Sequence, residues 1–222
     1  MRVEGSYSVY PVRAIIVMGV GGSGKSTIGA RLAQLLGNAP FIDADAFHPA
    51  ENVSKMAKGL PLTESDRWPW LQRVREEVEK EAVRLIKGQD APQSATRKII
   101  GEQRMDDSAS SKRLYVVCAC SSLKRSYREL LSRSDPDTPA DVQTHDTVFL
   151  YIDVSKQELA RRLRKRTGHF FGLSLLDSQL ETLEPPDTTR EAAIVVHGDD
   201  PEDDVVEEAH RKVTRYVTKN SL

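Results

Sequence analysis

The sequence GVGGSGKS, at residues 19–26, decides how the rest of the chain is interpreted. It has the pattern of a phosphate-binding loop: two glycines separated by four residues, then Lys25 and Ser26. The apolar, β-branched residues 14–18 before it predict a buried strand, and the apolar spacing of residues 27–36 after it predicts a helix. A strand, a glycine-rich loop and a helix in this order predict a site for nucleotide phosphates.

Each residue type in this loop has a chemical reason. Gly21, Gly22 and Gly24 have no Cβ, so the backbone N–H groups can come close to a polyphosphate. The following helix points its positive end at the same phosphates, Lys25 can reach the β and γ groups, and the Ser26 hydroxyl can bind Mg²⁺. A glycine-rich turn without function is the alternative, but the strand, the loop and the helix all agree with a nucleotide site.

Length and charge exclude several classes of protein. At 222 residues, the chain is long enough for one large α/β domain and short for two, so we expect a single domain over residues 1–222. Its 32 basic and 33 acidic residues give a formal net charge of −1, which favours neither nucleic acid nor an anionic membrane as a partner. The apolar runs are too short to span a bilayer, and the N-terminus lacks the order of a signal peptide. We therefore expect a cytoplasmic protein.

The second predicted strand covers residues 40–43, and two carboxylates stand at its end in the sequence Asp43-Ala44-Asp45. In an open α/β sheet the carboxyl ends of the strands line the ligand crevice, so this pair should face the phosphate loop. An aspartate there can accept a proton from an attacking hydroxyl or hold a water on Mg²⁺. The alternative is that one of the two only caps the turn that follows.

A long helix is predicted over residues 63–87, because apolar residues recur along one stripe. Pro69 suits the first turn of such a helix. Asp66 and Arg67 at this start could be a surface pair, but together with His48 they cluster around a loop beside the acidic pair. These residues are therefore candidates for the site.

Three cations, Lys124, Arg125 and Arg128, follow a predicted buried strand at residues 114–119. Lys124 and Arg128 are one helical turn apart and share a face, which could hold an anionic group. A solvated helix face is the alternative and, taken alone, the better explanation. Their place at the carboxyl end of the strand keeps them as candidates.

An arginine-rich segment follows the fourth predicted strand, which covers residues 148–152. Residues 155–166 predict a strongly basic helix, and residues 167–172 end it. A mobile segment of this kind can fold over bound nucleotide, neutralise transferred charge and exclude water. Nucleic-acid contact is the alternative, which the neutral net charge disfavours. We interpret residues 155–172 as a lid.

Strands and helices alternate along the chain, with a fifth strand at residues 192–196 and a closing helix at residues 201–217. This alternation predicts an α/β fold, in which helices cover both faces of a parallel sheet. Two polar segments without sustained periodicity, residues 88–113 and 132–147, predict surface loops.

The motifs together resemble the gluconokinases, a family of phosphate-loop kinases of small molecules related in fold to shikimate and adenylate kinases. The resemblance runs from about residue 13 to residue 197 and is carried by Gly19 to Ser26, Asp43 to Asp45 with Phe47 to Pro49, Asn52, Lys55 and Met56, Gly59 to Leu62, Asp66 and Arg67 with Pro69 to Leu71, Cys120 to Arg125 with Tyr127 and Arg128, Gly168 to Phe171, and Gln179 to Glu184. Many members carry Gly in place of Ala44. Segments 88–113 and 132–147 are longer than in compact bacterial members and resemble insertions in fungal ones.

This resemblance implies a three-layer α/β/α fold with a five-stranded parallel sheet of order 2-3-1-4-5 and a lid. It implies that ATP and Mg²⁺ are used to phosphorylate the 6-hydroxyl of D-gluconate, giving 6-phospho-D-gluconate for the pentose phosphate pathway. It also implies a homodimer.

Two other functions remain as alternatives. One is a kinase of the same fold that acts on shikimate or a nucleoside monophosphate, although His48, Arg67 and Lys124 suit a polyhydroxy acid better. The other is a nucleotide-binding protein without catalysis, which would be expected to lack Lys25 or Asp45.

The resemblance also assigns roles to residues of this chain. Asp45 would be the base for the acceptor hydroxyl and Lys25 the second catalytic residue, while Ser26 and, through water, Asp43 would hold the metal. Residues expected to bind ATP are Gly19, Val20, Gly21, Gly22, Ser23, Gly24, Lys25, Ser26 and Thr27, with Arg162 and Arg166 from the lid. Residues expected to bind the substrate are Asp45, His48, Arg67, Lys124, Arg125, Arg128 and His169.

Overall fold

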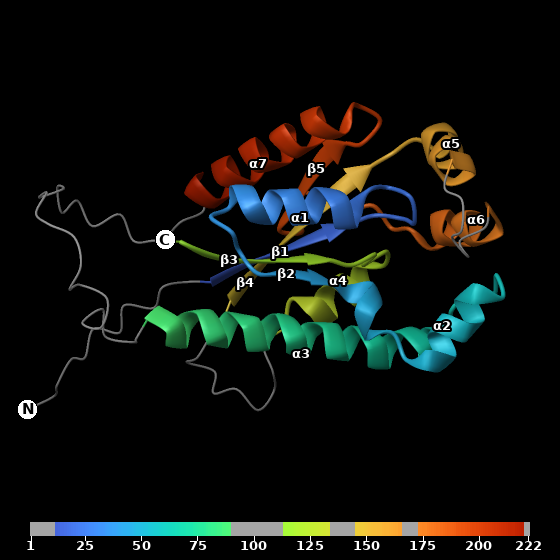
Figure 1. The fold of residues 1–222 in the computed structure, drawn as a ribbon, viewed down its shortest axis with the longest axis horizontal. Helices are drawn as coiled ribbons and strands as arrows, with labels where there is room; N and C mark the ends of the chain where they lie inside the picture. The colour runs from blue at the N-terminus through green and yellow to red at the C-terminus, as the bar shows by residue number, and fades with distance from the viewer. Residues whose placement is uncertain (1–11, 90–112, 134–144, 166–172, 220–222) are drawn as a thin grey trace, which may run out of the picture.

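The structure is a computed structural model that describes residues 12–89, 113–133, 145–165 and 173–219. In chain order its elements are β1 (Val12–Met18), α1 (Lys25–Leu35), β2 (Phe41–Asp43), the 3₁₀ helix η1 (Ala44–Phe47), α2 (Ala50–Ala57), α3 (Glu64–Gln89), β3 (Leu114–Ala119), α4 (Arg125–Leu131), β4 (His145–Asp153), α5 (Lys156–Lys165), α6 (Leu173–Thr182), β5 (Ala193–His197) and α7 (Glu202–Lys219). Figure 1 shows the sheet between two layers of helices.

The five strands form one parallel sheet in the order β2-β3-β1-β4-β5, which confirms the predicted order. β1 lies at the centre, where Ile15 pairs with Val117 of β3 on one side and with Val148 of β4 on the other. All seven residues of β1 are buried. Because helices cover both faces of a parallel sheet, such a central strand has an apolar run in place of alternation.

Each face of the sheet has its own apolar core. α1 and α7 pack on the face to which Ile15 and Val17 point, whereas α3 and α4 pack on the face of Ile16 and Met18 (Figure 1). These four side chains are fully buried, and burying a side chain of this size contributes about 1.5–3 kcal/mol. The end of β1 is therefore held firmly where it delivers the phosphate loop.

The start of α3 is fixed by Thr63 and Asp66. The Asp66 carboxylate accepts hydrogen bonds from the Thr63 N–H at 2.8 Å and from the Thr63 hydroxyl at 2.7 Å, in the manner of a capping box. Pro69 is the sixth residue of α3, so the prediction that it lies in the first turn is wrong. The helix continues through Pro69, which has no N–H to offer and so gives up one bond of the helical ladder.

β4 begins at His145, three residues before its predicted start, so the loop predicted over residues 132–147 is wrong at its end. These polar residues belong to the strand because they pair with β1, and Arg13 Nη2 donates to Asp146 Oδ2 at 3.1 Å. A pairing between distant segments leaves no periodicity in the sequence. The rest of that predicted loop, and most of residues 88–113, lie outside the described residues.

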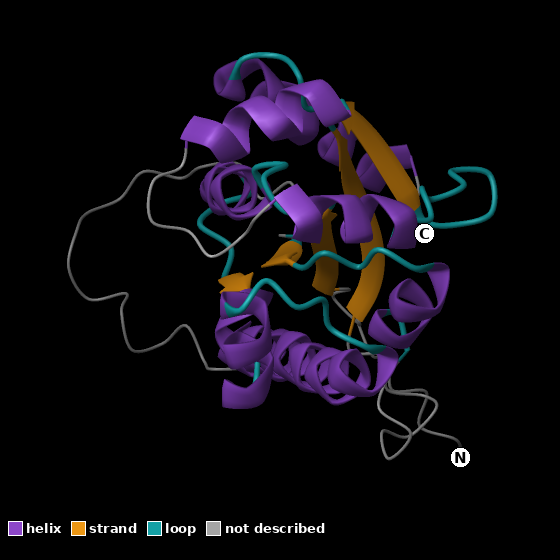
Figure 2. Cartoon of the chain, turned by 90° about the vertical axis from the view of Figure 1, so that its right-hand side faces the viewer, coloured by secondary structure: helices purple, strands orange, loops and turns teal. Residues whose placement is uncertain are grey.

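The carboxyl ends of the strands meet at one edge of the sheet. α2, α5 and α6 lie beyond this edge in Figure 1, and Figure 2 looks onto it. Ligands of open α/β sheets bind at such an edge. Within the described parts of the chain, every helix is too short or too polar to span a membrane.

Candidate active site

The phosphate loop, residues 19–24, joins β1 to α1 at this edge. Gly22 and Gly24 have φ angles of +85° and +97°, in the left-handed region that glycine adopts without strain. Gly24 is the N-cap of α1, so the N-terminus of this helix faces the loop. Lys25 Nζ donates to the Val20 carbonyl at 3.0 Å, which holds the ammonium group over the loop.

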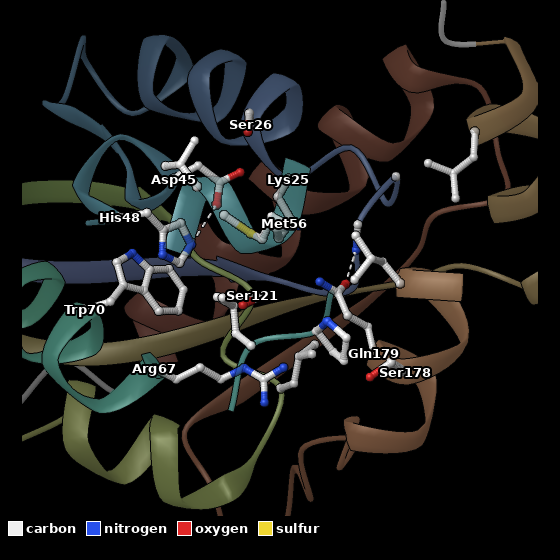
Figure 3. Close-up of a pocket in the computed structure, with 18 of the residues that line it drawn as sticks. Lys25, Ser26, Asp45, His48, Met56, Arg67, Trp70, Ser121, Ser178 and Gln179 are labelled. Carbon is white, nitrogen blue, oxygen red and sulfur yellow. Dashed lines mark hydrogen bonds and ion pairs between the residues drawn. The ribbon is translucent and has the colours of Figure 1, made fainter. Parts of the chain in front are cut away.

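A cavity of about 430 Å³ opens beside the loop. Its walls come from the phosphate loop with the start of α1, from the segment between β2 and α3 with the first turns of α3, from the segment after β3, and from α5 and α6. Of the predicted site residues, it is lined by Gly21, Gly22, Gly24, Lys25, Ser26, Thr27, Asp45, His48 and Arg67. Figure 3 shows Lys25, Asp45, His48 and Arg67 around this cavity. The structure therefore places Asp45 of the acidic pair in the same cavity as the phosphate loop, whereas Asp43 is not among the lining residues.

The two aspartates of the pair have different surroundings. Asp43 ends β2, and its Oδ1 accepts a hydrogen bond from the Asp45 N–H at 3.1 Å, which caps η1. The side chain of Asp45 is 79% exposed and lines the cavity. Ala44 between them is fully buried, so its methyl group takes no room from the cavity. Asp45 is thus the carboxylate that a ligand in the cavity meets.

His48 is held against the neighbouring wall by Trp70. The two rings are stacked, with centroids 4.1 Å apart and planes 17° apart, and Trp70 Nε1 donates to the Ala44 carbonyl at 2.8 Å. His48 Nε2 lies 4.0 Å from Asp45 Oδ1 (Figure 3). Burial lowers the pKa of His48, the nearby Asp45 raises it and Arg67 lowers it, with a net decrease. The imidazole is therefore predominantly neutral at pH 7.

Asp66 supports the site without lining the cavity. Its Oδ1 accepts a hydrogen bond from Lys55 Nζ at 2.6 Å. The bond from Lys55, followed by those from Thr63, holds the pKa of Asp66 well below its usual range. These contacts tie α2 to the start of α3, and Arg67, the next residue, lines the cavity.

The three cations predicted around α4 lie outside the lining of this cavity. Lys124 makes an ion pair with Glu64 of α3. Arg125 Nε lies 3.0 Å from an oxygen of Glu129, one helical turn away on α4. Both pairs are partly exposed. Lys124 and Arg125 therefore fit the alternative interpretation, a solvated helix face.

Arg128 is the most enclosed of the three, with 1% of its surface exposed. Its Nε and Nη2 donate to the two carboxylate oxygens of Glu191 at 2.6 and 2.9 Å. Its Nη1 donates to the carbonyls of Ser122, Leu123 and Glu184. The hydrogen bonds from Arg128 to the Glu191 carboxylate lower the pKa of Glu191. Together the bonds of Arg128 connect α4 to the segment before β5. The guanidinium is thus used within the protein, and sequence spacing could not show these partners.

Arg162 connects α5 with the phosphate loop. Its Nε donates to Glu158 at 2.7 Å, its Nη1 donates to the Ser23 carbonyl at 3.3 Å, and its Nη2 donates to the Gly198 carbonyl. A second cavity of about 490 Å³ lies here, between α5, the loop and the start of α7. Arg162 is therefore placed beside the phosphate loop. Arg166 lies outside the described residues.

Gln179 of α6 lines the cavity, although no sequence pattern predicted a role for it. Its Oε1 accepts a hydrogen bond from the Gly21 N–H at 2.6 Å, drawn as a dashed line in Figure 3. It belongs to residues 179–184, which contribute to the family resemblance, but a glutamine on a helix has no pattern that reveals its partner. His169, predicted to bind the substrate, lies outside the described residues.

The chain is similar in sequence to a protein family and to several gluconokinases, and similar in structure to a solved gluconokinase. A protein family described as "AAA domain" matches residues 15–169. A "Probable gluconokinase" of Xenopus tropicalis is 41% identical over 178 residues, covering 78% of each chain. A "Gluconokinase" of Gluconobacter oxydans (strain 621H) is 41% identical over 199 residues, covering 90% of each chain. The crystal structure of a gluconokinase from Sinorhizobium meliloti 1021 is similar with a TM-score of 0.68 and 36% identity, covering 95% of each chain.

Proposed function

We infer that this chain, which belongs to the gluconokinase family of phosphate-loop kinases, is a gluconokinase that transfers a phosphoryl group from ATP to D-gluconate. The observation in the structure that supports this most is that Lys25, directly after the phosphate loop, lines the same cavity as Asp45, His48 and Arg67. Phosphoryl transfer requires mainly that two substrates lie in line and that charge is balanced at the transferring group. A single cavity lined both by the phosphate loop and by Asp45, His48 and Arg67 can hold the two substrates next to each other.

We propose that the phosphates of ATP bind against the backbone N–H groups of the loop. Lys25 would balance the negative charge of the β and γ phosphates. Arg162, whose guanidinium contacts the Ser23 carbonyl, would face the nucleotide from α5. The cavity of about 490 Å³ beside Arg162 offers room for the rest of the nucleotide.

We propose Mg²⁺ as the ion that accompanies ATP. Ser26 supplies a hydroxyl at the cavity, and Asp43, whose Oδ1 accepts from the Asp45 N–H, can act through a water molecule. Oxygen donors of this kind fit Mg²⁺. Among the described residues, no group of three or more His, Cys, Asp or Glu side chains is placed to hold a metal ion. The ion would therefore depend on phosphate oxygens and water for its other ligands, and it would supply further charge balance.

Asp45 is the proposed base. As the 6-hydroxyl oxygen of D-gluconate forms a bond to the γ-phosphorus, its proton passes to the Asp45 carboxylate. The bond between the γ-phosphorus and the bridging oxygen breaks, and its electron pair leaves with ADP. The products are ADP, 6-phospho-D-gluconate and one proton.

Arg67 is the proposed partner of the substrate carboxylate. It lines the cavity together with Asp45, and a guanidinium suits a carboxylate because it can donate two parallel hydrogen bonds. D-Gluconate carries its carboxylate and its 6-hydroxyl at opposite ends, so one molecule would reach both residues. We assign Arg128 to holding α4, because its donors already serve Glu191 and three carbonyls.

The substrate is tested by measuring ADP release with Mg-ATP and D-gluconate, shikimate, glycerate or AMP. We expect turnover with D-gluconate and a product that 6-phosphogluconate dehydrogenase oxidises. Turnover with another acceptor alone would keep phosphoryl transfer and overturn the substrate. Absence of turnover with all four would overturn the activity.

We further propose a homodimer, as the family resemblance implies. Light scattering after size-exclusion chromatography should give about twice the chain mass of 24.8 kDa. A mass equal to that of one chain would contradict this proposal.

A further inference from the structure

Asn52 of α2 is a buried polar side chain with no role in the proposed reaction as described above. It is 3% exposed. Its Nδ2 donates to the backbone carbonyl of Asp66 at 3.0 Å and lies 3.4 Å from Nδ1 of His48. Because a carbonyl oxygen can only accept, the end of the amide that faces Asp66 must be the NH₂ group. The backbone of α3 therefore fixes the orientation of the Asn52 amide.

This orientation decides the tautomer of His48. One hydrogen of the Asn52 NH₂ group goes to the Asp66 carbonyl, and the other points at Nδ1 of His48. A ring nitrogen that faces a donor must offer its lone pair, so the hydrogen of the neutral imidazole lies on Nε2. Stacking on Trp70 holds the ring in place. The Nε2–H is therefore directed to the side of the ring on which Asp45 lies.

The distance of 4.0 Å between His48 Nε2 and Asp45 Oδ1 is too long for a direct hydrogen bond. A hydroxyl oxygen about 2.8 Å from each atom fits across this gap at roughly a right angle. Both residues line the cavity. In that position the hydroxyl accepts from the Nε2–H and donates its own hydrogen to Asp45, and one lone pair remains for the bond to phosphorus.

We propose that Asn52 is a positioning residue of the acceptor site. It holds His48 as the Nε2–H tautomer, and His48 and Asp45 together orient the acceptor hydroxyl. The identity of this hydroxyl rests on the proposed function, whereas the tautomer of His48 does not.

The charges around His48 agree with a neutral ring. Lys25, Asp45 and Arg67 are the charged residues that line the same cavity. Burial and Arg67 oppose the imidazolium form, and they outweigh the attraction from Asp45. Asn52 and Trp70, which contact the ring from α2 and α3, carry no charge.

The tautomer can be read without substrates. Long-range ¹H–¹⁵N correlation spectra at pH 7 report which nitrogen is protonated in each of the five histidines, and the spectrum of His48→Gln assigns the His48 signals by difference. We expect a neutral imidazole with its hydrogen on Nε2. An Nδ1–H tautomer or an imidazolium would overturn the proposal, whatever the acceptor is.

Asn52→Asp tests the functional consequence, because it replaces the NH₂ donor by an oxygen of similar size. We expect His48 to take up a proton at Nδ1. We also expect kcat with D-gluconate to fall about 10–100-fold, by analogy with other partners that orient a functional histidine, while the KM for ATP is unchanged. Asn38→Asp makes the same chemical change at an exposed turn and should alter neither quantity.

A purely structural role for Asn52 gives a different result. If Asn52 only ties α2 to α3, Asn52→Asp lowers the melting temperature but leaves the His48 tautomer and kcat unchanged, and the proposal is overturned. Failure of the proposed function is distinguishable, because the wild type would then show the Nε2–H tautomer without turnover of D-gluconate.

Discussion

The two walls of the cavity are built by different means. On the phosphate wall, the proposed ligand contacts are backbone N–H groups of the phosphate loop together with Lys25, which are contiguous in the sequence. On the acceptor wall, they are the side chains of Asp45, His48 and Arg67, which come from η1, its end and α3. The backbone N–H groups are positioned by the conformation of the loop itself. The side chains of the acceptor wall are each oriented by residues from other elements.

The same difference separates two arginines that the sequence placed in one role. Arg67 lines the cavity, but Arg128 is buried and bonded to Glu191. Both are arginines near the start of a helix, α3 for Arg67 and α4 for Arg128, so residue type and position in the helix do not distinguish them. Only the neighbours decide whether a cation serves a ligand or the fold.

The largest effect should come from the phosphate wall, through Lys25→Met. We expect kcat to fall about 10³–10⁵-fold, the range for a cation that stabilises a transferring phosphoryl group. The circular dichroism spectrum should be unchanged, because this side chain lies in the cavity. Lys58→Met, at an exposed position after α2, is the control and should keep wild-type kcat. Turnover near the wild-type rate in Lys25→Met would contradict the proposed role of Lys25 in balancing the phosphate charge.

On the acceptor wall, Asp45→Asn should lower kcat about 10²–10⁴-fold, as expected for loss of a general base. The amide keeps the size of the carboxylate, so binding of D-gluconate should be retained. Steady-state kinetics with varied D-gluconate separates the two effects. A higher KM with normal kcat would show that Asp45 binds the substrate without acting as the base.

Arg128→Leu sharpens the contrast between the two arginines. We expect the free energy of unfolding in urea to fall by about 3–5 kcal/mol, because Glu191 and three carbonyls lose their buried partner, while the KM for D-gluconate stays near the wild-type value. Arg125→Ala, an exposed neighbour with one ion pair on its own helix, should cost less than about 1 kcal/mol. Retained stability with a raised KM would instead place Arg128 in the substrate site.

The smallest effect concerns Glu158, which holds Arg162 beside the phosphate loop. Hydrogen bonds from Arg161 and Arg162 lower the pKa of Glu158 from 4.5 to about 2. Because the carboxylate is favoured in the folded state, this stabilisation is complete above pH 4.5 and is lost as the pH falls toward 2. Melting curves should show that Glu158→Gln is slightly less stable than the wild type at pH 7 and that the difference shrinks below pH 4.5. A difference that grows in acid would contradict the pairing.

Much of the fold could be predicted from the sequence, because local patterns determine it. The buried strand at residues 14–18, the phosphate loop and the alternation of strands and helices all follow from period and composition, and the strand order followed from the resemblance. The early start of β4 could not be predicted, since His145 and Asp146 become strand only by pairing with β1.

The site was predictable only in part, for the same reason. Lys25 and Asp45 are marked by motifs at the ends of predicted strands. Asn52 and Gln179 lie in stretches that resemble the family, but the Asp66 carbonyl and the Gly21 N–H that they contact become visible only when separate elements come together. Arg128 meets its partner Glu191 in the same way.

Binding measurements on Lys25→Met and Arg67→Gln test most directly whether the two walls serve two ligands. Isothermal titration calorimetry would give the affinity of each variant for D-gluconate and for a non-hydrolysable ATP analogue with magnesium. We predict a crossed result: Lys25→Met loses affinity for the nucleotide and keeps it for D-gluconate, and Arg67→Gln does the opposite. Equal losses for both ligands in both variants, or no loss in either, would contradict the account.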